Sequence, residues 1–305
     1  MTTEPIKRVL VTGATGFIGR QSLAPLLARG FEVHAVTSHP LVRPSGNWHQ
    51  ADLLQAPQVA ALLETVRPTH LLHFAWYAKH GEFWTSAENL RWVQASLDLL
   101  RQFQRHGGER VVMAGTCAEY DWGHGTCVEA TTPIVPISLY GTAKQALSLI
   151  LASFAATTGL SAAWGRIFLV YGPFEHPDRL VAAVCRALLK GEPALCSHGE
   201  QVRDLLFATD AADAFAALLD SPVSGTVNVA SGQPMALDVV VRAIADLLGR
   251  PDLLRFGALA TAPDDPPRLV ADTARLNQEL GWYPQTGLTQ GLQETIAWWR
   301  KGLGQ

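Results

Sequence analysis

Short apolar runs alternate with longer amphipathic stretches through the first half of the chain. Each apolar run predicts a buried strand, and each stretch with apolar residues three and four apart predicts a helix. Glycine or proline closes several of these stretches, as at Gly30, Pro68 and Gly107. The pattern predicts strands over residues 8–12, 31–36, 69–75, 109–115 and 161–170, and helices over residues 17–29, 56–66, 85–106 and 139–158.

Strands that alternate with helices at this spacing indicate an α/β fold with a Rossmann-type, doubly wound parallel sheet. The rhythm changes after Gly172, where the pattern becomes richer in loops. There it predicts helices over residues 179–190, 210–219, 237–248, 273–280 and 288–300, and strands over residues 205–208 and 226–229. We therefore expect residues 1–171 and 205–230 to form the Rossmann domain. Residues 172–204 and 231–305 would form a smaller C-terminal lobe.

Composition narrows the class of protein. The chain has 305 residues, of which 48% are hydrophobic and 17% charged, so it is expected to fold around a core. Its net charge of −3 gives no basic surplus for binding nucleic acid. The longest apolar stretch, residues 147–156, is too short to span a bilayer, and residues 1–7 are too polar for a signal peptide. We expect a cytoplasmic protein that binds neither nucleic acid nor membrane.

Cysteine spacing excludes two further classes. The four cysteines include no C-x-x-C pair, so the sequence indicates neither a zinc ribbon nor a disulfide framework. We expect reduced thiols and no metal site.

A glycine-rich segment follows the first predicted strand. Gly13, Gly16 and Gly19 are spaced three apart in the sequence Thr-Gly-Ala-Thr-Gly-Phe-Ile-Gly, which opens a helix. Glycines let the backbone approach phosphates, and a helix N-terminus offers free N–H groups and a positive dipole. The segment therefore predicts a site for a dinucleotide pyrophosphate, formed by residues that include Thr15, Phe17 and Ile18.

A possible catalytic set follows the fourth predicted strand. Tyr140 and Lys144 are four residues apart on a predicted helix and share one of its faces. The ammonium would favour the phenolate, so that the phenol can exchange a proton with a sugar or alcohol hydroxyl. Thr116 lies at the carboxyl end of a strand, where open α/β sheets bind ligands, and its hydroxyl would hydrogen-bond the reacting oxygen.

Together these motifs resemble the extended short-chain dehydrogenase/reductase superfamily, and within it the NAD(P)-dependent sugar-nucleotide epimerase/dehydratase family. The resemblance covers nearly the whole chain. It implies that Thr116, Tyr140 and Lys144 are catalytic and that the smaller lobe binds a nucleotide-diphospho-sugar. It also implies cofactor contacts from Ser38 after the second predicted strand, from Asp52 and Leu53, and from Phe74 and Ala75 after the third predicted strand.

The resemblance extends to the nucleotide-sugar itself. Arg203 matches an arginine that contacts the diphosphate in the family, and Arg268 falls where a second such arginine is usual. Guanidinium groups match phosphate oxygens well, which makes this role physically reasonable. A surface ion pair, such as Arg203 with Asp204, is the alternative interpretation.

Several positions depart from the family pattern. Dehydratases of the family carry Asp and Glu directly after the catalytic Thr, where this chain has Cys117 and Ala118, so a 4,6-dehydratase is not expected. Epimerase-reductases use a Cys and a His at positions that hold Ala118 and Phe174 here; Cys117 and His176 are out of register. The family's helix Asn and motif Gly are replaced by the residues Trp92 and Asp121, with Asn89 one turn before Trp92.

The choice of cofactor depends on the end of the second strand. Family members that use NAD carry an acid there, whereas this chain has Thr37, Ser38 and His39, with Arg43 beyond. No carboxylate would repel a 2′-phosphate, so NADP(H) is favoured over NAD(H).

Two enzymatic functions use the same residues. A 4-ketoreductase transfers one hydride and releases oxidised cofactor, which the missing acid favours. A 4-epimerase oxidises and then reduces the same carbon and retains tightly held NAD. A dinucleotide sensor without catalysis would typically lack the Tyr or the Lys, and an enzyme for a small carbonyl compound would need no diphosphate arginines.

The resemblance also implies a homodimer, formed by the helices over residues 85–106 and 139–158. Their apolar residues exceed one narrow stripe, although the excess would be equally consistent with packing on the sheet. These apolar residues include Leu90, Val93, Leu97, Leu147, Ile150 and Leu151.

Overall fold

A seven-stranded parallel sheet forms the centre of the computed structural model, which describes residues 6–40 and 46–304. The strand order is β3-β2-β1-β4-β5-β7-β11, so the chain winds outward from β1 in both directions. This confirms the predicted Rossmann-type fold. The strands are β1 (Arg8–Thr12), β2 (Glu32–Thr37), β3 (Asn47–Gln50), β4 (His70–His73), β5 (Arg110–Thr116), β7 (Ser161–Ile167) and β11 (Gly225–Val229).

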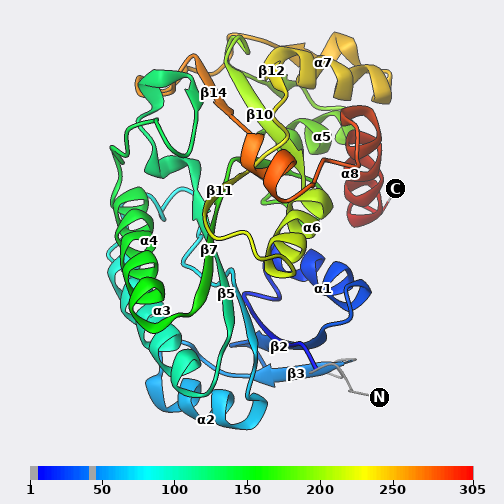
Figure 1. Cartoon of the computed structure of the whole chain (residues 1–305). Coiled ribbons are helices and arrows are strands. Elements are labelled where there is room, and N and C mark those ends of the chain that lie inside the picture. Colours follow the sequence, from blue (N-terminus) through cyan, green and yellow to red (C-terminus); the bar gives the residue numbers. More distant parts are fainter. Residues whose placement is uncertain (1–5, 41–45, 305) are drawn as a thin grey trace.

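Helices cover both faces of this sheet (Figure 1). On one face lie α1 (Gly19–Ala28) and α6 (Ala208–Leu219), and on the other lie α2 (Ala56–Val66), α3 (Glu88–Arg105) and α4 (Leu139–Thr158). Leu26 and Phe215 are fully buried in the first layer, and Phe103 and Leu147 in the second. Because both faces are covered, the strands are continuous apolar runs, which is why the sequence pattern located them.

A second, five-stranded sheet lies beside the first (Figure 1). It has the order β12-β10-β14-β6, and β8 also pairs with β10. Its strands are β6 (Thr126–Cys127), β8 (Leu169–Tyr171), β10 (Val202–Phe207), β12 (Pro234–Ala236) and β14 (Arg268–Ala271). A third core joins it to α5 (Leu180–Lys190), α7 (Leu237–Leu248) and α8 (Leu288–Gly302). The remaining elements are the pair β9 (Ala194–Leu195) and β13 (Leu254–Arg255) and the short helical turns η1 (Cys117–Glu119), η2 (Trp122–His124), η3 (Pro251–Leu253) and η4 (Arg275–Glu279).

The structure differs from the sequence pattern in several places, including the short strands β6, β9, β12, β13 and β14, which the pattern did not predict. Strand β3 was not predicted, because Asn47–Gln50 is not an apolar run. The strand predicted over residues 161–170 divides at Phe168 into β7 and β8, which join different sheets. Residues 205–207, which we expected in the main sheet, pair with β8 in the second sheet, whereas α6 and β11 return to the first. The helix predicted over residues 273–280 is a π-helical turn, η4.

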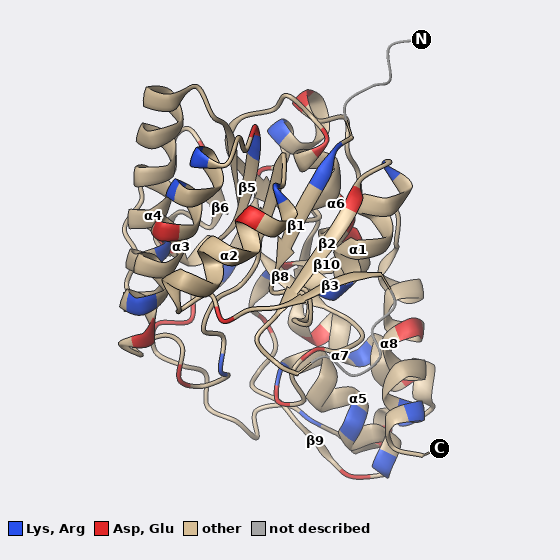
Figure 2. Cartoon of the chain, turned by 90° about the horizontal axis from the view of Figure 1, so that it is seen from below, with Lys and Arg blue, Asp and Glu red and all other residues tan. Residues whose placement is uncertain are grey.

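Charged residues of both signs are mixed along the chain (Figure 2). None of the described helices combines the length and the apolar character that crossing a membrane requires. The division into a Rossmann domain and a smaller lobe, with the boundaries given above, stays our proposal.

Candidate active site

The glycine-rich loop connects β1 to α1 and has little room for side chains. Gly13 has a φ of +68°, and a Cβ there would lie 2.8 Å from the backbone nitrogen of Ala75. A Cβ on Gly19 would lie 2.2 Å from the carbonyl oxygen of Gly13. The amide of Gly16 also donates to that carbonyl oxygen, at 2.9 Å. The loop is therefore a tight backbone turn in which only glycine fits at Gly13 and Gly19.

The N-terminus of α1 is suited to an anion. No side chain caps it at Ile18, and its first turn contains no acidic residue. Thr15 and Gly16 are exposed beside it, whereas Phe17 and Ile18 are partly buried against the core. Uncapped N–H groups and the helix dipole attract phosphate oxygens, so this terminus fits a dinucleotide pyrophosphate.

Arg20, which sequence reasoning did not select, holds this loop in shape. Its guanidinium donates to the carbonyl oxygens of Thr15 and Gly16 and lies 4.0 Å from the centre of the Phe174 ring. Phe174 follows β8 and has a φ of +71°, an uncommon conformation for a bulky residue. The glycine-rich loop and the segment after β8 are thus in contact.

The other residues expected at the cofactor lie at the carboxyl ends of β2, β3 and β4. Ser38 is exposed directly after β2. Asp52 is half-buried and accepts a hydrogen bond from the amide of Leu54 at 3.0 Å, while Leu53 is buried in the core. Arg43 lies outside the described residues.

Phe74 and Ala75 follow β4 and pack beside the glycine-rich loop. The amide of Ala75 donates to the hydroxyl of Thr12 at 3.3 Å, and the ring of Phe74 meets Phe215 edge to face at 4.9 Å. These contacts fix the distance between the two loops. The carboxyl edge of the sheet therefore brings together the residues expected to hold the cofactor.

Thr116 and Tyr140 meet at the same edge. Thr116 ends β5 and is buried, and its side chain lies near enough to the phenol of Tyr140 to act on its pKa. Tyr140 lies in the first turn of α4, where Phe83 and Trp84 flank its ring edge to face at 4.9 and 5.7 Å. Burial raises the pKa of the Tyr140 phenol, and the Thr116 side chain opposes that rise.

Lys144 lies one turn further along α4 and is 4% exposed. Its ammonium donates to the carbonyl oxygen of Ala114 at 2.8 Å and lies over the ring of Trp76, 3.8 Å from the centre. Burial lowers the pKa of Lys144 to about 7, while the charge of Glu119 acts to raise it. The end of β5, with Thr116, thus lies against the first turns of α4, which hold Tyr140 and Lys144.

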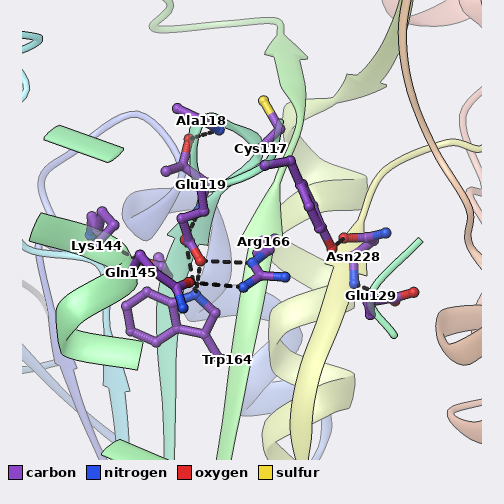
Figure 3. A network of polar contacts seen from close by, with 12 residues as sticks. Cys117, Ala118, Glu119, Glu129, Lys144, Gln145, Trp164, Arg166 and Asn228 are labelled. Atoms are coloured by element: carbon purple, nitrogen blue, oxygen red, sulfur yellow. Dashed lines mark hydrogen bonds and ion pairs between the residues drawn. The ribbon is translucent and has the colours of Figure 1, made fainter. Parts of the chain in front are cut away.

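Sequence reasoning missed a buried carboxylate, Glu119, which lies between Lys144 and Arg166 in Figure 3. Glu119 is fully buried in η1, and its Oε2 accepts a hydrogen bond from Nε of Arg166 at 2.7 Å. Nε1 of Trp164 donates to both carboxylate oxygens, at 3.0 and 3.1 Å. A signal was present in the sequence, because Glu119 is the one charged residue in the stretch from residue 111 to residue 120.

Other residues noted in the sequence have local structural partners. Cys117 is buried beside Cys127, and burial raises the pKa of its thiol to about 12. Asn89 is buried and accepts a hydrogen bond from Nε1 of Trp76 at 2.8 Å. His176 is exposed and stacks on His80 with ring centres 4.5 Å apart.

Trp92 and Asp121, which also depart from the family pattern, have local structural contacts as well. Trp92 is partly buried next to Trp76, with ring centres 6.4 Å apart. Asp121 caps η2 by accepting a hydrogen bond from the amide of Gly123 at 2.9 Å.

The two arginines expected at the diphosphate lie on neighbouring strands of the second sheet. Arg203 in β10 is 4% exposed and pairs with Asp265, whereas Arg268 in β14 is exposed, with its Nε 3.5 Å from the hydroxyl of Thr126. In the register, Val202 rather than Arg203 is the partner of Arg268. Because paired residues share a face and successive residues alternate, the two guanidinium groups leave the sheet on opposite faces. The structure does not bring them together.

No group of three or more potential metal-ligating side chains occurs in residues 6–40 and 46–304.

Comparisons with known proteins agree with this geometry. The chain is 28% identical to a dTDP-glucose 4,6-dehydratase of Xanthomonas campestris, over 95% of this chain and 92% of that protein. It is 29% identical to a UDP-glucose 4-epimerase of Azospirillum brasilense, over 99% of this chain and 94% of that protein. Among solved structures, MoeE5 in complex with UDP-glucose and NAD superposes with a TM-score of 0.85 at 31% identity, over 97% of this chain and 99% of that chain.

A family model matches the segment that carries these features. The match covers residues 9–230, from β1 and the glycine-rich loop, through Thr116, Tyr140 and Lys144, to the end of β11. Because this segment spans more than half of the chain and contains the whole main sheet, the chain belongs to the NAD dependent epimerase/dehydratase family.

Proposed function

We propose that this protein is an NAD(P)-dependent oxidoreductase that reduces the C4 keto group of a nucleotide-diphospho-sugar. The observation that carries the proposal is the packing of α4, which holds Tyr140 and Lys144, against the carboxyl end of β5, which holds Thr116. The relatives named above act on, or are solved with, dTDP- and UDP-linked sugars, which supports the same substrate class here.

Each catalytic residue has a distinct task in this proposal. When bound, a nicotinamide dinucleotide supplies the hydride. Tyr140 holds the proton that the keto oxygen receives, and the hydroxyl of Thr116 hydrogen-bonds that oxygen. The ammonium of Lys144 stabilises the phenolate that remains, because an adjacent positive charge favours the ionised phenol. Lys144 would also bond the nicotinamide ribose, as the family resemblance implies.

Dehydration of the sugar is not proposed, although one relative is a dehydratase. Elimination of water needs an acid and a base next to the reacting carbons. Cys117 has a raised pKa and Ala118 has no ionisable group. The nearest carboxylate along the chain, Glu119, is fully buried and paired with Arg166, so it is not available to a substrate.

A 4-epimerase is the second candidate, favoured by the similarity to the Azospirillum enzyme. It would use the same three residues twice on one sugar and would retain its cofactor. Reductase and epimerase therefore differ in whether the cofactor dissociates. We favour the reductase because no carboxylate follows β2, where Ser38 and His39 are exposed.

This same feature leads us to favour NADP(H) over NAD(H). A 2′-phosphate would lie near Ser38 without meeting a negative charge. The solved relatives that carry NAD make NAD(H) the alternative. Comparing the dissociation constants of NADPH and NADH would decide, and tighter binding of NADH would reverse this choice.

For the substrate diphosphate we propose Arg203 as the principal contact. Its guanidinium is buried and already holds an anionic partner, Asp265, on a loop. Arg268 was expected at the same diphosphate, but it lies on the opposite face of the sheet and could contribute only after rearrangement. The smaller lobe would then enclose the nucleotide.

We also propose a homodimer through α3 and α4. Leu147 and Leu151 face the sheet and are buried, whereas Leu90, Leu149 and Ile150 are 59%, 62% and 43% exposed. An exposed apolar patch on two adjacent helices is typical of a protein interface. Sedimentation at micromolar concentration would give the mass of two chains, and the mass of one chain would contradict the proposal.

The decisive experiment is an assay with a nucleotide-linked 4-keto-hexose. Purified protein with added NADPH should consume the reduced cofactor, and the Tyr140→Phe variant should not. Interconversion of UDP-glucose and UDP-galactose without added cofactor, together with NAD released on denaturing the protein, would instead establish the epimerase.

A further inference from the structure

The buried carboxylate of Glu119 joins three elements near the catalytic residues. Its acceptor oxygens are bonded by the amide of Thr116 at the end of β5, and by Trp164 and Arg166 in β7. Nη2 of Arg166 continues the network to Oε1 of Gln145 in α4, at 3.0 Å. Figure 3 shows Glu119 between Lys144 and Arg166, with the thiol of Cys117 pointing away from this cluster.

The hydrogen-bond partners of Glu119 are those that suit an ionised carboxylate. Each of its partners is a hydrogen-bond donor: a backbone amide, an indole N–H and a guanidinium. A protonated acid would need an acceptor for its own O–H, and neither oxygen faces one among these partners. Burial raises the pKa of Glu119, and Arg166 acts against that rise.

Glu119 also fixes the backbone that carries Thr116. Its Oε1 accepts the hydrogen bond from the Thr116 amide at 2.8 Å, while the Thr116 hydroxyl accepts one from the Ala118 amide at 3.2 Å. This reciprocal pair is a capping box, which sets the angle at which β5 turns into η1. The hydroxyl expected to bond the keto oxygen is therefore held by Glu119.

The charges around Lys144 come from several elements. His73 in β4 is neutral at physiological pH, because burial lowers its pKa to about 3. Tyr140 in α4 and Cys117 in η1 both have raised pKa values and are uncharged. Arg166 in β7 is a cation. Glu119 is the one anion among these neighbours whose charge acts to raise the pKa of Lys144.

We propose that Glu119 is a positioning residue for the reaction: it supplies the negative charge that balances Lys144 and holds the backbone of Thr116 in its reactive orientation. It acts through these two residues and does not touch the substrate. The proposal rests on the catalytic roles proposed above for Thr116 and Lys144. The proposal gives a reason for the presence of the ion pair between Glu119 and Arg166, since burying two charges is by itself unfavourable.

The test reads the charge of Lys144 directly in the protein without cofactor. The chain has five lysines, Lys7, Lys79, Lys144, Lys190 and Lys301, so the ¹³Cε resonance of each can be followed by NMR in lysine-labelled protein. Lys144 is assigned by its loss in Lys144→Met. We expect its titration midpoint in the wild type to be near neutrality, well below the pKa of 10.5 of an ordinary lysine.

The variant Glu119→Gln keeps the size of the side chain and removes its charge. We expect the midpoint of Lys144 to fall by about one pH unit, the order expected for loss of a nearby opposite charge. The alkaline limb of the kcat profile should move to lower pH by a similar amount, because uncharged Lys144 no longer supports Tyr140. The other four midpoints should not move.

Asp210→Asn is the matched control. Asp210 is also a buried carboxylate, and it accepts three hydrogen bonds, from the amides of Gln285 and Thr286 and from the Thr286 hydroxyl. The same change from carboxylate to amide there should leave both the Lys144 midpoint and the pH profile unchanged. An equal shift in this control would mean that the effect is general destabilisation and would overturn the proposal.

Glu119→Asp keeps the charge but shortens the side chain by one methylene. We expect the Lys144 midpoint to stay within about 0.3 pH unit of the wild type, with a lower kcat because the bond to Thr116 is lost. This variant keeps the proposal testable if Glu119→Gln does not fold. A fall of a full unit in Glu119→Asp, or an unchanged midpoint in folded Glu119→Gln, would overturn the proposal.

These outcomes are separate from those of the proposed function. The NMR titration needs neither cofactor nor sugar. A protein that fails to reduce any nucleotide-linked keto sugar, yet shows the Lys144 shift in Glu119→Gln, would refute the substrate and leave the positioning role intact.

Discussion

The main sheet and the second sheet each contain a buried arginine that pairs with a carboxylate. The two pairs differ in how far the carboxylate is exposed to water. At the catalytic edge, Arg166 and Glu119 are 4% and 0% exposed, and three further donors or acceptors surround them. In the second sheet, Arg203 is 5% exposed, but its partner Asp265 is 32% exposed. A buried ion pair is stable only when its remaining hydrogen bonds are satisfied, which the first pair achieves internally.

The comparison separates a fixed pair from an exchangeable one. Glu119 is bound by residues of the main sheet and cannot leave without unfolding η1. Asp265 lies on a loop with prolines on both sides, at Pro263 and Pro266, and water reaches it. A substrate anion that replaced Asp265 would find Arg203 already oriented. The pair of Glu119 and Arg166 is therefore enclosed, whereas the pair of Arg203 and Asp265 is open to exchange of its anion.

The largest expected effect is at the catalytic edge itself. Tyr140→Phe removes only the phenolic hydroxyl, so we expect the fold and cofactor affinity to survive. Turnover should fall by about 10²- to 10⁴-fold, as for loss of a general acid. Steady-state kinetics with the keto sugar would measure this. Cys117→Ser is the control and should be mild; a reversal of the two results would assign proton transfer to the thiol.

The fixed pair should be costly to break. Arg166→Met leaves Glu119 as an unpaired buried charge, and we expect the free energy of unfolding to fall by about 3–5 kcal/mol. Chemical denaturation would measure the loss. Arg203→Met should cost less, because Asp265 can turn into solvent. Equal losses in the two variants would contradict the distinction between the pairs.

Lys144→Met should raise the free energy of unfolding, whereas the two arginine variants lower it. Burial lowers the pKa of Lys144 to about 7 in the folded protein, against 10.5 for an ordinary lysine. The unfolded chain therefore binds the proton more tightly between these values, and folding is disfavoured below pH 10. We expect the variant without cofactor to gain about 1–3 kcal/mol at pH 7, while turnover is lost.

The pH dependence provides the check on that sign. The wild type should become more stable as the pH rises from 7 towards 10, and the advantage of Lys144→Met should shrink over the same range. Denaturation midpoints at several pH values would show this. If the stability advantage of Lys144→Met over the wild type grew with pH, titration of Lys144 would not be the cause of the pH dependence.

The smallest effect is expected at the exchangeable pair. Asp265→Asn removes a partly exposed charge and keeps an amide oxygen that can still accept from the buried Arg203, so the free energy of unfolding should change by less than about 1 kcal/mol. Thermal unfolding would measure it, with Arg166→Met as the sensitive reference. A loss as large as that of Arg166→Met would show that Asp265 is as fixed as Glu119.

The candidate cofactor and catalytic motifs were accessible from the sequence because their geometry is local. Glycines spaced three apart, and a Tyr and a Lys four apart, define a turn and a helix face whatever the rest of the chain does. The ends of parallel strands then place these local motifs at one edge. Strand β3 and the strands of two to four residues in the second sheet lack enough pattern to be predicted.

Pairings between distant residues were not accessible in the same way. Arg203 and Asp265 are 62 residues apart, and neither their contact nor the register of β10 against β14 follows from a local pattern. The pair of Glu119 and Arg166 is partly indicated by the sequence. Each residue is a single charge in an apolar segment, and the two segments contain the neighbouring strands β5 and β7. A search for isolated charges would therefore have linked them.

Gly115 lies directly behind the buried carboxylate. A Cβ there would come within 2.1 Å of Nε1 of Trp164 and 2.7 Å of Oε1 of Glu119. The residue at position 115 is therefore not free to change alone: a larger side chain needs room from both Trp164 and Glu119. Substitutions at these three positions are consequently coupled, and an evolving chain would have to change them together.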